Sequence, residues 1–374
     1  MKLTHLALKR LDIPFKTSFK HSSAARSQTE SVIAIAESDN GRTGYGEGCP
    51  RHYVTGETIE TAFEFFEDHR QTLIAIAGLD HLKEWMRQHK LALDKNPAAW
   101  CAVELALLDL LGKEQGKPVE AVLSLPEIAG PFYYTAVLGV ASFQAFKKQY
   151  ETYCNMGFTD FKIKVSGNIQ EDKENISLFN ADSNSSRRVR LDANNLWENA
   201  DEAIEVIRKM DYPFFAVEEP LSAEDYDGCL KLYNALNIPV ILDESFKRIE
   251  QFESIRKNPE AWIINVRISK MGGLLRSLAI MENAEKAHIS LIVGAQVGET
   301  SILTRAALAA ANPFRGSILA QEGAFGTHLL EKDIADPPLM FGEHGILTPS
   351  SQLKSPGLGL DIIMPDESFR DIDN

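Results

Sequence analysis

Several features that would assign a sequence to a particular class are scarce in this chain of 374 residues. Its four cysteines, at positions 49, 101, 154 and 229, lie far apart and form no CxxC pair. We therefore expect buried free thiols, and neither a disulfide framework nor a zinc site. Positive charge is also in deficit, because 39 Lys and Arg face 53 Asp and Glu and give a net charge of -14. Binding to nucleic acid or to an anionic membrane needs a basic face and is not expected.

Long apolar runs are missing as well. None approaches the ~20 residues that cross a bilayer, and the first ten residues place basic side chains on both sides of a very short apolar stretch, unlike a signal peptide. Hydrophobic residues make up 44% and charged residues 25%, which are ordinary globular values and exclude a disordered or collagen-like chain. The expectation is a cytoplasmic globular protein with two or three domains.

The first third of the chain mixes strand and helix signals. Residues 3–11 and 31–37 are predicted as strands, and Asp39-Asn40-Gly41 is typical of a hairpin turn. The glycine-rich segment 44–48 runs into Cys49-Pro50 and not into a helix, so we predict a loop there and no phosphate-binding turn.

A helix is predicted to follow Asn96. This residue supplies the N-cap, Pro97 occupies the first helical position, and the helix runs through Leu111, with Gly112 and then Gly116-Lys117-Pro118 as stop signals. Together these elements predict an α+β domain over residues 1–128.

From residue 132 onward, short strand-like runs alternate with helical stretches. Eight such runs fit a (β/α)8 barrel better than an open doubly wound sheet, because the count matches and no GxGxxG motif opens a helix. The predicted fold class is α/β, with a modified TIM barrel at residues 129–330. The segment 331–374 is rich in Pro, Gly and Asp and is expected to pack back on the first domain. The predicted strands are 132–138, 160–164, 188–192, 214–218, 240–243, 262–266, 289–293 and 317–320.

Ionisable residues stand at the C-terminal ends of five of these eight predicted strands. In a barrel of this kind the C-terminal ends of the strands form the site. Each residue alone would more often cap a helix or face solvent, but one functional group per strand–helix unit is a pattern that chance rarely produces. The residues are Lys162, Lys164, Asp192, Glu218, Asp243 and Lys270.

The three carboxylates are predicted to hold a metal ion. Asp192, Glu218 and Asp243 end consecutive strands, and hard oxygen ligands without His or Cys nearby suit Mg²⁺, with Mn²⁺ as an alternative. Of the pair Glu218-Glu219, we expect Glu218 to point inward, because bulky side chains at alternating positions suit the helix-facing side.

The lysines are predicted to carry the proton chemistry. Lys162 and Lys164 share one face of their strand, and two ammonium groups so close should favour the neutral form of each other. We assign the base to Lys164 and a contact with a substrate carboxylate oxygen to Lys162. Lys270 should end the sixth strand, four strands away, and face Lys164 across the barrel mouth. Asn194 and Glu244 either support these groups or only cap helices and meet solvent.

This set resembles the enolase superfamily, and within it the muconate lactonizing enzyme subgroup. The shared pattern is KxK on the second strand, Asp, Glu and Asp on the next three, and a lysine on the sixth, and the resemblance spans nearly the whole chain, including the helix at 102–112 and the segment 44–48. Enolase-superfamily sites use a Lys or His base with Mg²⁺. The mandelate racemase subgroup is disfavoured, because its strand-seven histidine is missing and His288 falls at the start of that strand.

The resemblance also implies where substrate binds. In this family, loops of an N-terminal capping domain, here about 15–26 and 48–56, close over the barrel mouth. Dipeptide epimerases of the subgroup hold an ammonium group with Asp-x-Asp on strand eight, where this chain has Gln321-Glu322-Gly323, so Glu322 is a partial substitute. The segment 325–330 looks more like muconate cycloisomerases. The expected substrate-binding residues are Phe19, Arg26 (for a distal carboxylate), Thr135, Gln296, Glu299 and Glu322.

Three functions follow as hypotheses. The first is an Mg²⁺-dependent isomerase that racemises or epimerises an amino-acid derivative or dipeptide by proton transfer between Lys164 and Lys270. The second uses one lysine as acid or base and the other as a cation, in a muconate-type cycloisomerase or a syn-dehydratase resembling o-succinylbenzoate synthase. The third is a non-catalytic metal-binding protein with the same fold. The expected partner is a small-molecule carboxylate, and the family resemblance implies a homo-oligomer.

Overall fold

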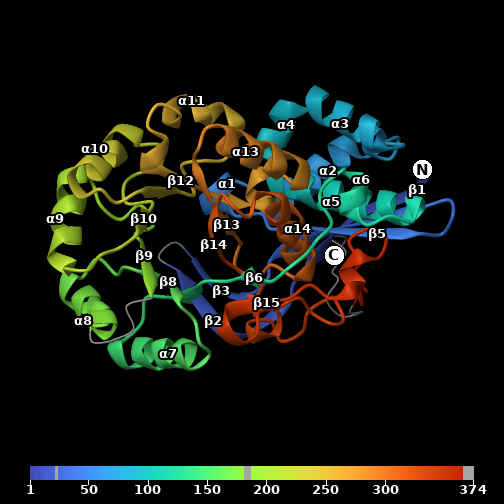
Figure 1. The fold of residues 1–374 in the computed structure, drawn as a ribbon. Coiled ribbons are helices and arrows are strands. Elements are labelled where there is room, and N and C mark those ends of the chain that lie inside the picture. The colour runs from blue at the N-terminus through green and yellow to red at the C-terminus, as the bar shows by residue number, and fades with distance from the viewer. Residues whose placement is uncertain (22–23, 181–186, 365–374) are drawn as a thin grey trace.

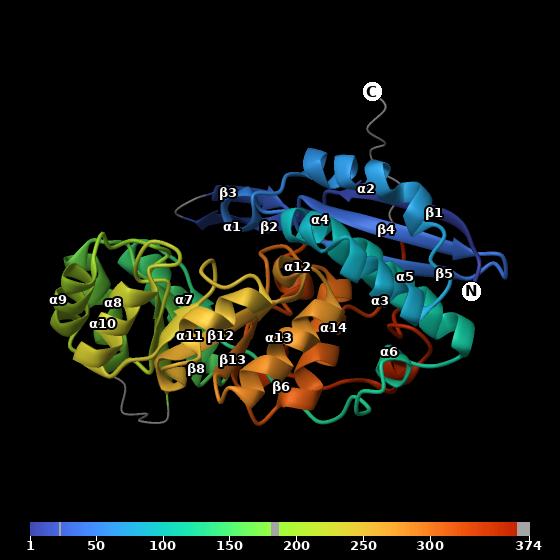
Figure 2. The ribbon, with the colours of Figure 1, turned by 90° about the horizontal axis from the view of Figure 1, so that it is seen from above.

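The computed structural model describes residues 1–21, 24–180 and 187–364, and the side chains of all these residues except 17–21 and 24–25. An N-terminal sheet with helices lies against one side of a larger barrel of strands and helices (Figures 1 and 2). In the described residues, no helix is long and apolar enough to cross a membrane.

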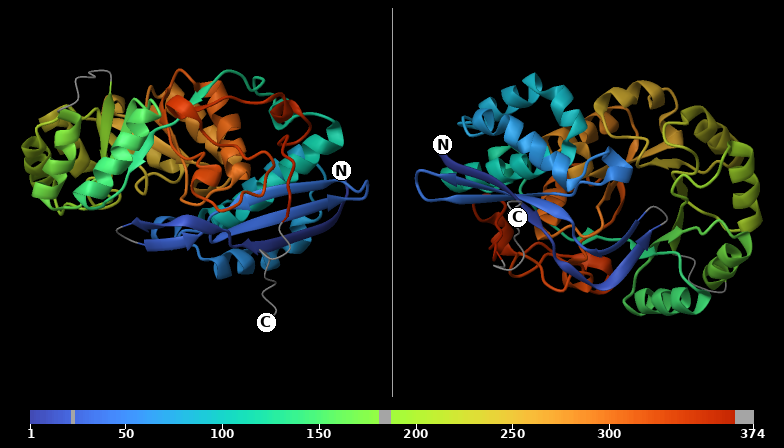
Figure 3. Two further views of the ribbon diagram at one scale, coloured as in Figure 1. Left: turned by 90° about the horizontal axis from the view of Figure 1, so that it is seen from below. Right: turned by 180° about the vertical axis from the view of Figure 1, so that it is seen from behind.

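The N-terminal sheet is antiparallel, with the strand order β1-β4-β5. Its central strand β4 is buried at almost every position, which fits its β-branched and small apolar sequence. A separate hairpin, β2–β3, reaches from this sheet toward the barrel (Figure 3), where the Lys16 N–H donates to the Leu329 carbonyl at 2.8 Å. The strands are β1 (Leu3–Leu11), β2 (Pro14–His21), β3 (Ala24–Gln28), β4 (Ser31–Ser38) and β5 (Thr43–Gly48).

The glycine-rich segment forms strand β5, so the predicted loop is wrong. A Cβ atom added at Gly44, Gly46 or Gly48 would lie 2.2, 2.0 or 1.9 Å from a backbone carbonyl oxygen of the helix packed on it, α5 (Pro97–Gln115). The glycines are therefore there to let a helix approach the strand, and no phosphate-binding turn is formed.

Helix α5 lies between the N-terminal sheet and the barrel (Figure 2). It is buried along its whole length from Pro97 to Gly112, which explains why its sequence is apolar on every side. It begins where predicted and continues past Gly112, the first predicted stop, and Gly116, the second predicted stop, ends it with φ 64°. The other helices of this part are α1 (His52–Thr55), α2 (Ile59–Leu73), α3 (Leu79–Gln88), α4 (Lys90–Lys95) and α6 (Val119–Val122).

The barrel has eight parallel strands in sequential order from β7 to β14. The Thr135 N–H, just before the first strand, donates to the carbonyl of Gln321 on the last strand at 2.8 Å and links the two edges. The predicted α/β barrel with an N-terminal α+β domain is confirmed. The strands are β7 (Ala136–Leu138), β8 (Asp160–Lys164), β9 (Arg188–Asp192), β10 (Ala216–Glu218), β11 (Val240–Leu242), β12 (Trp262–Arg267), β13 (Ser290–Gly294) and β14 (Ile318–Gln321).

Helices follow the barrel strands along its outer side (Figure 1). They are α7 (Phe143–Asn155), α8 (Ile169–Asn180), α9 (Ala200–Met210), α10 (Tyr226–Leu236), α11 (Phe252–Ile255), α12 (Ile268–Met271), α13 (Leu274–Lys286) and α14 (Ser301–Ala311).

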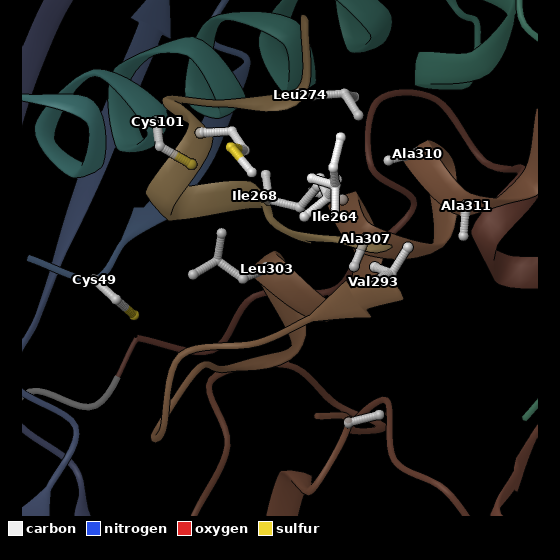
Figure 4. Close-up of a cluster of buried hydrophobic side chains, with 14 of the residues drawn as sticks. Cys49, Cys101, Ile264, Ile268, Leu274, Val293, Leu303, Ala307, Ala310 and Ala311 are labelled. Atoms are coloured by element: carbon white, nitrogen blue, oxygen red, sulfur yellow. The ribbon is translucent and has the colours of Figure 1, made fainter. Parts of the chain in front are cut away.

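The two parts share a buried apolar contact. Figure 4 shows Cys49 beside β5 and Cys101 on α5 facing Ile268 of α12 and Leu303 of α14. All four side chains are buried, and the four cysteines of the chain are free. Three of the cysteines are buried as expected, whereas Cys154 is only half-buried.

The C-terminal segment returns to the N-terminal part. Strand β15 (Ile346–Leu347) pairs with β6 (Phe132–Tyr133), so the predicted strand 132–138 is interrupted and only its second half joins the barrel. Farther along, the Leu358 N–H donates to Asp109 of α5 at 2.7 Å. The last residues of the predicted tail, 365–374, lie outside the described residues, and the domain boundaries themselves stay predictions.

Candidate active site

A cavity of about 600 Å³ opens at the C-terminal ends of the barrel strands. Its polar lining includes Lys162, Lys164, Arg267 and Glu322, and Tyr53 from the N-terminal part closes one side. The remaining wall is mostly apolar and comes from the β7 end, helix α7 and the segment after β14. Six of the predicted site residues line this cavity, namely Lys162, Lys164, Glu244, Gln296, Glu299 and Glu322.

The three predicted metal ligands lie at neighbouring strand ends. Asp192 ends β9, Glu218 ends β10 and Asp243 follows β11 directly, and each is at most 2% exposed. Lys162 Nζ lies 3.1 Å from Asp192 Oδ2 and 2.7 Å from Glu218 Oε2, while Arg267 pairs with Asp243. In this arrangement the carboxylates face cations, and no group of three metal-binding side chains is assembled among the described residues.

The carboxylates nevertheless form a set that fits a divalent cation. They are hard oxygen donors, buried and held in place by neighbouring groups. Asn265 donates to Glu218 Oε1 at 3.1 Å, and Lys270 donates to Asp243 Oδ1 at 2.8 Å. Such supporting contacts orient metal ligands.

Asp192 and Glu218, which both contact Lys162, differ in their pKa. Burial raises the pKa of Glu218 to about 8, although Lys162 opposes the shift. Burial acts in the same direction on Asp192, but the attraction of both Lys162 and Lys164 outweighs it and holds the pKa of Asp192 well below its usual range. The charge of Asp192 is therefore the more firmly fixed of the two.

Glu218 points into the site as predicted, and Glu219 turns away from it. Glu219 has φ 39°, in the left-handed region. Its carboxylate accepts hydrogen bonds from the Asp243 N–H at 2.6 Å and from the Ser245 N–H at 2.8 Å. Glu219 thereby fixes the backbone that carries Asp243.

Lys162 and Lys164 lie in different surroundings. Lys162 is 3% exposed and touches three carboxylates, the third being Glu322 at 3.3 Å. Burial lowers its pKa, but these carboxylates outweigh burial and raise the pKa above its ordinary value. The expected mutual neutralisation of the two lysines therefore does not hold for Lys162. Lys164 lines the cavity, lies 3.2 Å from Asp192 Oδ2 and donates to Asn194 Oδ1 at 2.8 Å.

Lys270 does not occupy the position predicted for it. It lies on α12, after the strand, and its Nζ donates to Asp243 O, Asp243 Oδ1 and Asn265 O at 2.7 to 2.8 Å. It lines a separate small cavity together with Arg248 and Arg276, and not the large one. The expectation that Lys270 faces Lys164 across the mouth is thus corrected, because the sixth strand ends at Arg267 and Lys270 lies beyond it in α12.

Arg267 ends β12 and lines the large cavity instead. It pairs with Asp243, and its Nη1 donates to Gln296 Oε1 at 3.1 Å. Burial acts to lower its pKa, but Asp243 and Glu244 outweigh burial and keep the pKa above its already high value. Sequence reasoning missed this residue, although it directly follows the predicted strand 262–266.

Glu322 is also held differently from the prediction. Its Oε1 lies 2.7 Å from Nη2 of Arg190, a fully buried residue of β9 that sequence reasoning missed. Thr135 does not line the cavity but accepts from Arg190 at 3.2 Å and donates to Asp160 at 2.5 Å deeper in the barrel. Glu322 therefore already has two cationic partners, Arg190 and Lys162.

Three further predicted residues line the cavity. Burial raises the pKa of both Glu244 and Glu299 to about 8, and Glu299 accepts from the Gln296 N–H at 2.6 Å. Glu244 Oε2 and Gln296 Nε2 are buried and have no hydrogen-bond partner. Arg26 instead pairs with Glu30 and lies 5.8 Å from the ring centre of Tyr53, and the side chain of Phe19 is outside the described residues.

Family comparisons agree with this geometry. Residues 4–124 match the mandelate racemase / muconate lactonizing enzyme N-terminal domain, and residues 145–367 match the enolase C-terminal domain-like family. The chain belongs to the enolase superfamily, in the mandelate racemase / muconate lactonizing enzyme family. The family resemblance is confirmed, and the isomerase chemistry expected from it agrees with the names of similar proteins.

Racemases and epimerases of this superfamily are among the similar proteins. N-succinyl-L-Arg/Lys racemase of Bacillus cereus is 27% identical over 97% of this chain and 96% of its own length. Hydrophobic dipeptide epimerase of Enterococcus faecalis is 28% identical over 83% of this chain and 87% of its own.

Solved structures of epimerases are also similar to this chain. A substrate-liganded L-Ala-D/L-Glu epimerase of Bacillus subtilis has a TM-score of 0.85 at 26% identity and covers 96% of this chain and 99% of its own. Dipeptide epimerase of E. faecalis, complexed with Mg and L-Leu-L-Tyr, has a TM-score of 0.82 at 25% identity and covers 96% and 99%. Magnesium is thus the metal found in solved relatives.

Proposed function

We propose that this protein removes the proton next to a carboxylate group of an amino-acid derivative, with Lys164 as the base, and so forms an enolate in an isomerisation. The observation that carries the proposal is the position of Lys164 at the cavity wall, 3.2 Å from the first of three buried carboxylates. Relatives that act on N-succinyl amino acids and on dipeptides support this substrate class.

Each residue of the site has its own role in this reaction. Asp192, Glu218 and Asp243 would hold Mg²⁺, or Mn²⁺ in its place, and the bound ion would stabilise the negative charge that develops on the substrate carboxylate. Lys162 stays charged and can donate to a carboxylate oxygen of the substrate. Asn194 Oδ1 orients Lys164 by accepting a hydrogen bond from its Nζ at 2.8 Å, and Lys164 takes the α-proton.

The apolar wall indicates the rest of the substrate. Val137, Met156, Phe325, Leu329 and Phe341 all line the cavity. A ligand that fills it should carry its carboxylate at the strand ends and an apolar or neutral group beyond.

Hydrogen–deuterium exchange tests the proposal. The protein is incubated in D₂O with saturating Mg²⁺ and a panel of N-succinyl amino acids, N-acetyl amino acids and dipeptides, each as separate stereoisomers. We expect deuterium at the α-carbon of at least one compound, and its loss in Lys164→Ala. No exchange from any compound would contradict the proposal and favour a non-catalytic metal-binding protein.

A second candidate is favoured by the guanidinium at the end of β12. A cycloisomerase acting on a muconate-like diacid, or a syn-dehydratase, needs one acid–base lysine and a cation, which is what Lys164 and Arg267 supply. Product mass separates the two reactions, because a dehydratase releases water and a cycloisomerase leaves the mass unchanged.

A further inference from the structure

Lys164 and Arg267 lie on opposite walls of the cavity. β8 and β12 are four strands apart in the sequential order of the eight-stranded barrel, and Lys164 and Arg267 each end one of them. Both side chains line the same cavity. A substrate whose carboxylate lies at the three acids therefore has an ammonium group on one face and a guanidinium on the other.

The guanidinium is firmly held and still has a free donor. Its Nη2 pairs with Asp243 and its Nη1 with Gln296, so its plane is fixed on the cavity wall. Its Nε is buried and has no hydrogen-bond partner, and neither has Nε2 of Gln296. These two nitrogens are buried, but the Arg267 side chain is 12% exposed at the cavity wall, so its fixed positive charge is suited to an oxygen of an anionic ligand.

Arginine cannot replace lysine as a base. A guanidinium keeps its proton in proteins, whereas a lysine can lose it and act as a general base. Lys270 cannot serve either, because its three protons are donated to Asp243 and Asn265 and it lines a different cavity. Among the described residues, the lysine at the cavity wall that is not enclosed by carboxylates is Lys164.

We propose that Arg267 is a substrate-binding cation and that Lys164 alone removes and returns the α-proton, so that proton exchange is confined to one face of the substrate. This inference rests on the proposed function. In the step, the C–H bond breaks, its electron pair enters the enolate, and the proton moves to Lys164 Nζ. The reverse step returns a proton from the same Nζ to the same face, so these two steps leave the configuration unchanged. The isomerisation then consists of a bond change elsewhere in the enolate, as in the cycloisomerase candidate.

The exchange experiment tests the inference when the two stereoisomers are followed separately. Each is incubated with the protein and Mg²⁺ in D₂O, deuterium is measured by mass spectrometry, and configuration is measured by chiral chromatography. We expect the wild-type protein to place deuterium in one stereoisomer with retained configuration and to leave the other unlabelled. Labelling of both stereoisomers, or inversion, overturns the inference while leaving the proposed function intact. No labelling of either overturns both.

A matched set of variants tests whether a lysine at position 267 adds proton exchange on the second face of the substrate. Arg267→Lys places an ammonium group where the guanidinium lies, so labelling of the second stereoisomer should appear together with inverted product. Arg256→Lys, at an exposed residue beyond α11, is the control for the same substitution and should behave like the wild type. If Arg267→Lys shows the labelling pattern of the wild type while folded, the inference is wrong.

Binding measurements separate a direct role of Arg267 from a structural one. Calorimetry with the labelled stereoisomer should show that Arg267→Met weakens binding about tenfold or more, and that Arg267→Lys restores part of it. Labelling on the Lys164 face should survive in Arg267→Met at saturating substrate. Equal affinity in all three proteins, with unchanged thermal unfolding, would overturn the assignment of Arg267 as a substrate-binding cation.

Discussion

Arg190 and Glu322 form an ion pair inside the barrel, with 2.7 Å between Nη2 and Oε1. Arg190 is fully buried, and its other guanidinium nitrogen lies 2.7 Å from Asp160. Glu322 also accepts from Lys162 at 3.3 Å. The strand-eight acid is therefore neutralised by the protein itself, which argues against a free ammonium group of a substrate binding there.

Removal of this acid should destabilise the fold. Glu322→Gln leaves Arg190 and Lys162 with one counter-charge fewer in a buried site, and breaking a buried pair in this way costs about 3 kcal/mol or more. Urea denaturation measures the loss. The control Glu282→Gln removes the partner of Lys286 in an exposed pair and should change the free energy of unfolding by less than about 1 kcal/mol. Equal effects of the two substitutions would contradict the structural role of Glu322.

The close contact between β5 and α5 gives a second prediction. Gly46→Ala would place a Cβ 2.0 Å from the carbonyl oxygen of Ala102, so the sheet and the helix must separate. We expect a loss of about 2 kcal/mol or more, measured by thermal or urea unfolding. Gly78→Ala is the control, because nothing lies within 4 Å of its added Cβ and its φ of 176° suits any residue. A Gly46→Ala protein with the same free energy of unfolding as the wild type would contradict the packing of α5 on β5.

A buried acid between the two parts gives a pH prediction. Glu104 on α5 accepts from the Leu275 N–H at 3.0 Å and from Trp100 Nε1 at 3.2 Å. Burial raises its pKa to about 7, although these donors favour the charged form. The folded state therefore binds this proton more tightly than the unfolded chain does. Its contribution to stability is present at low pH and declines as the pH rises from about 4.5 to about 7.

Glu104→Gln removes this titration. The decline in unfolding free energy between pH 5 and pH 7 should be smaller in the variant than in the wild type, as measured by urea midpoints at several pH values. The exposed Glu205→Gln is the control and should leave the slope unchanged. A slope in Glu104→Gln as steep as in the wild type would contradict the prediction.

The sequence predicted the local pattern of the site well, because chain order and strand periodicity determine it. β8 and β9 have the predicted bounds, and the acids at 192, 218 and 243 lie at neighbouring strand ends. What it could not predict depends on contacts between distant residues. Arg190 stands inside a strand, and its partner Glu322 is 132 residues away. The glycines of β5 have a reason only once α5 is packed on them.

The prediction of Lys270, where the structure has Arg267 at the cavity, has a simpler cause. The expected residue is a lysine near the end of the sixth strand, and Lys270 lies three positions after Arg267. The strand ends at Arg267, and the next residues turn into α12, so a shift of three residues moves a side chain from the cavity to the other side of Asp243. The predicted strand 262–266 ends within one residue of this point, so the error is the choice of the lysine four residues beyond that end and not the strand boundary.

The three carboxylates give the last prediction. Removal of divalent cations with a chelator should abolish α-proton exchange, and Mg²⁺ should restore it, because the enolate charge then lacks its main stabilising group. Asp192→Asn should lower the exchange rate by about a hundredfold or more.

Thermal unfolding supplies a second measurement that does not depend on a substrate. Mg²⁺ binds the folded state, so it should raise the unfolding temperature of the wild-type protein, and this shift should be lost in Asp192→Asn. Asp201→Asn, in an exposed pair with Lys231, is the control and should keep both the shift and the exchange. Exchange at the full rate after chelation, or an Mg²⁺-dependent shift in Asp192→Asn equal to that of the wild type, would contradict a metal site at these residues.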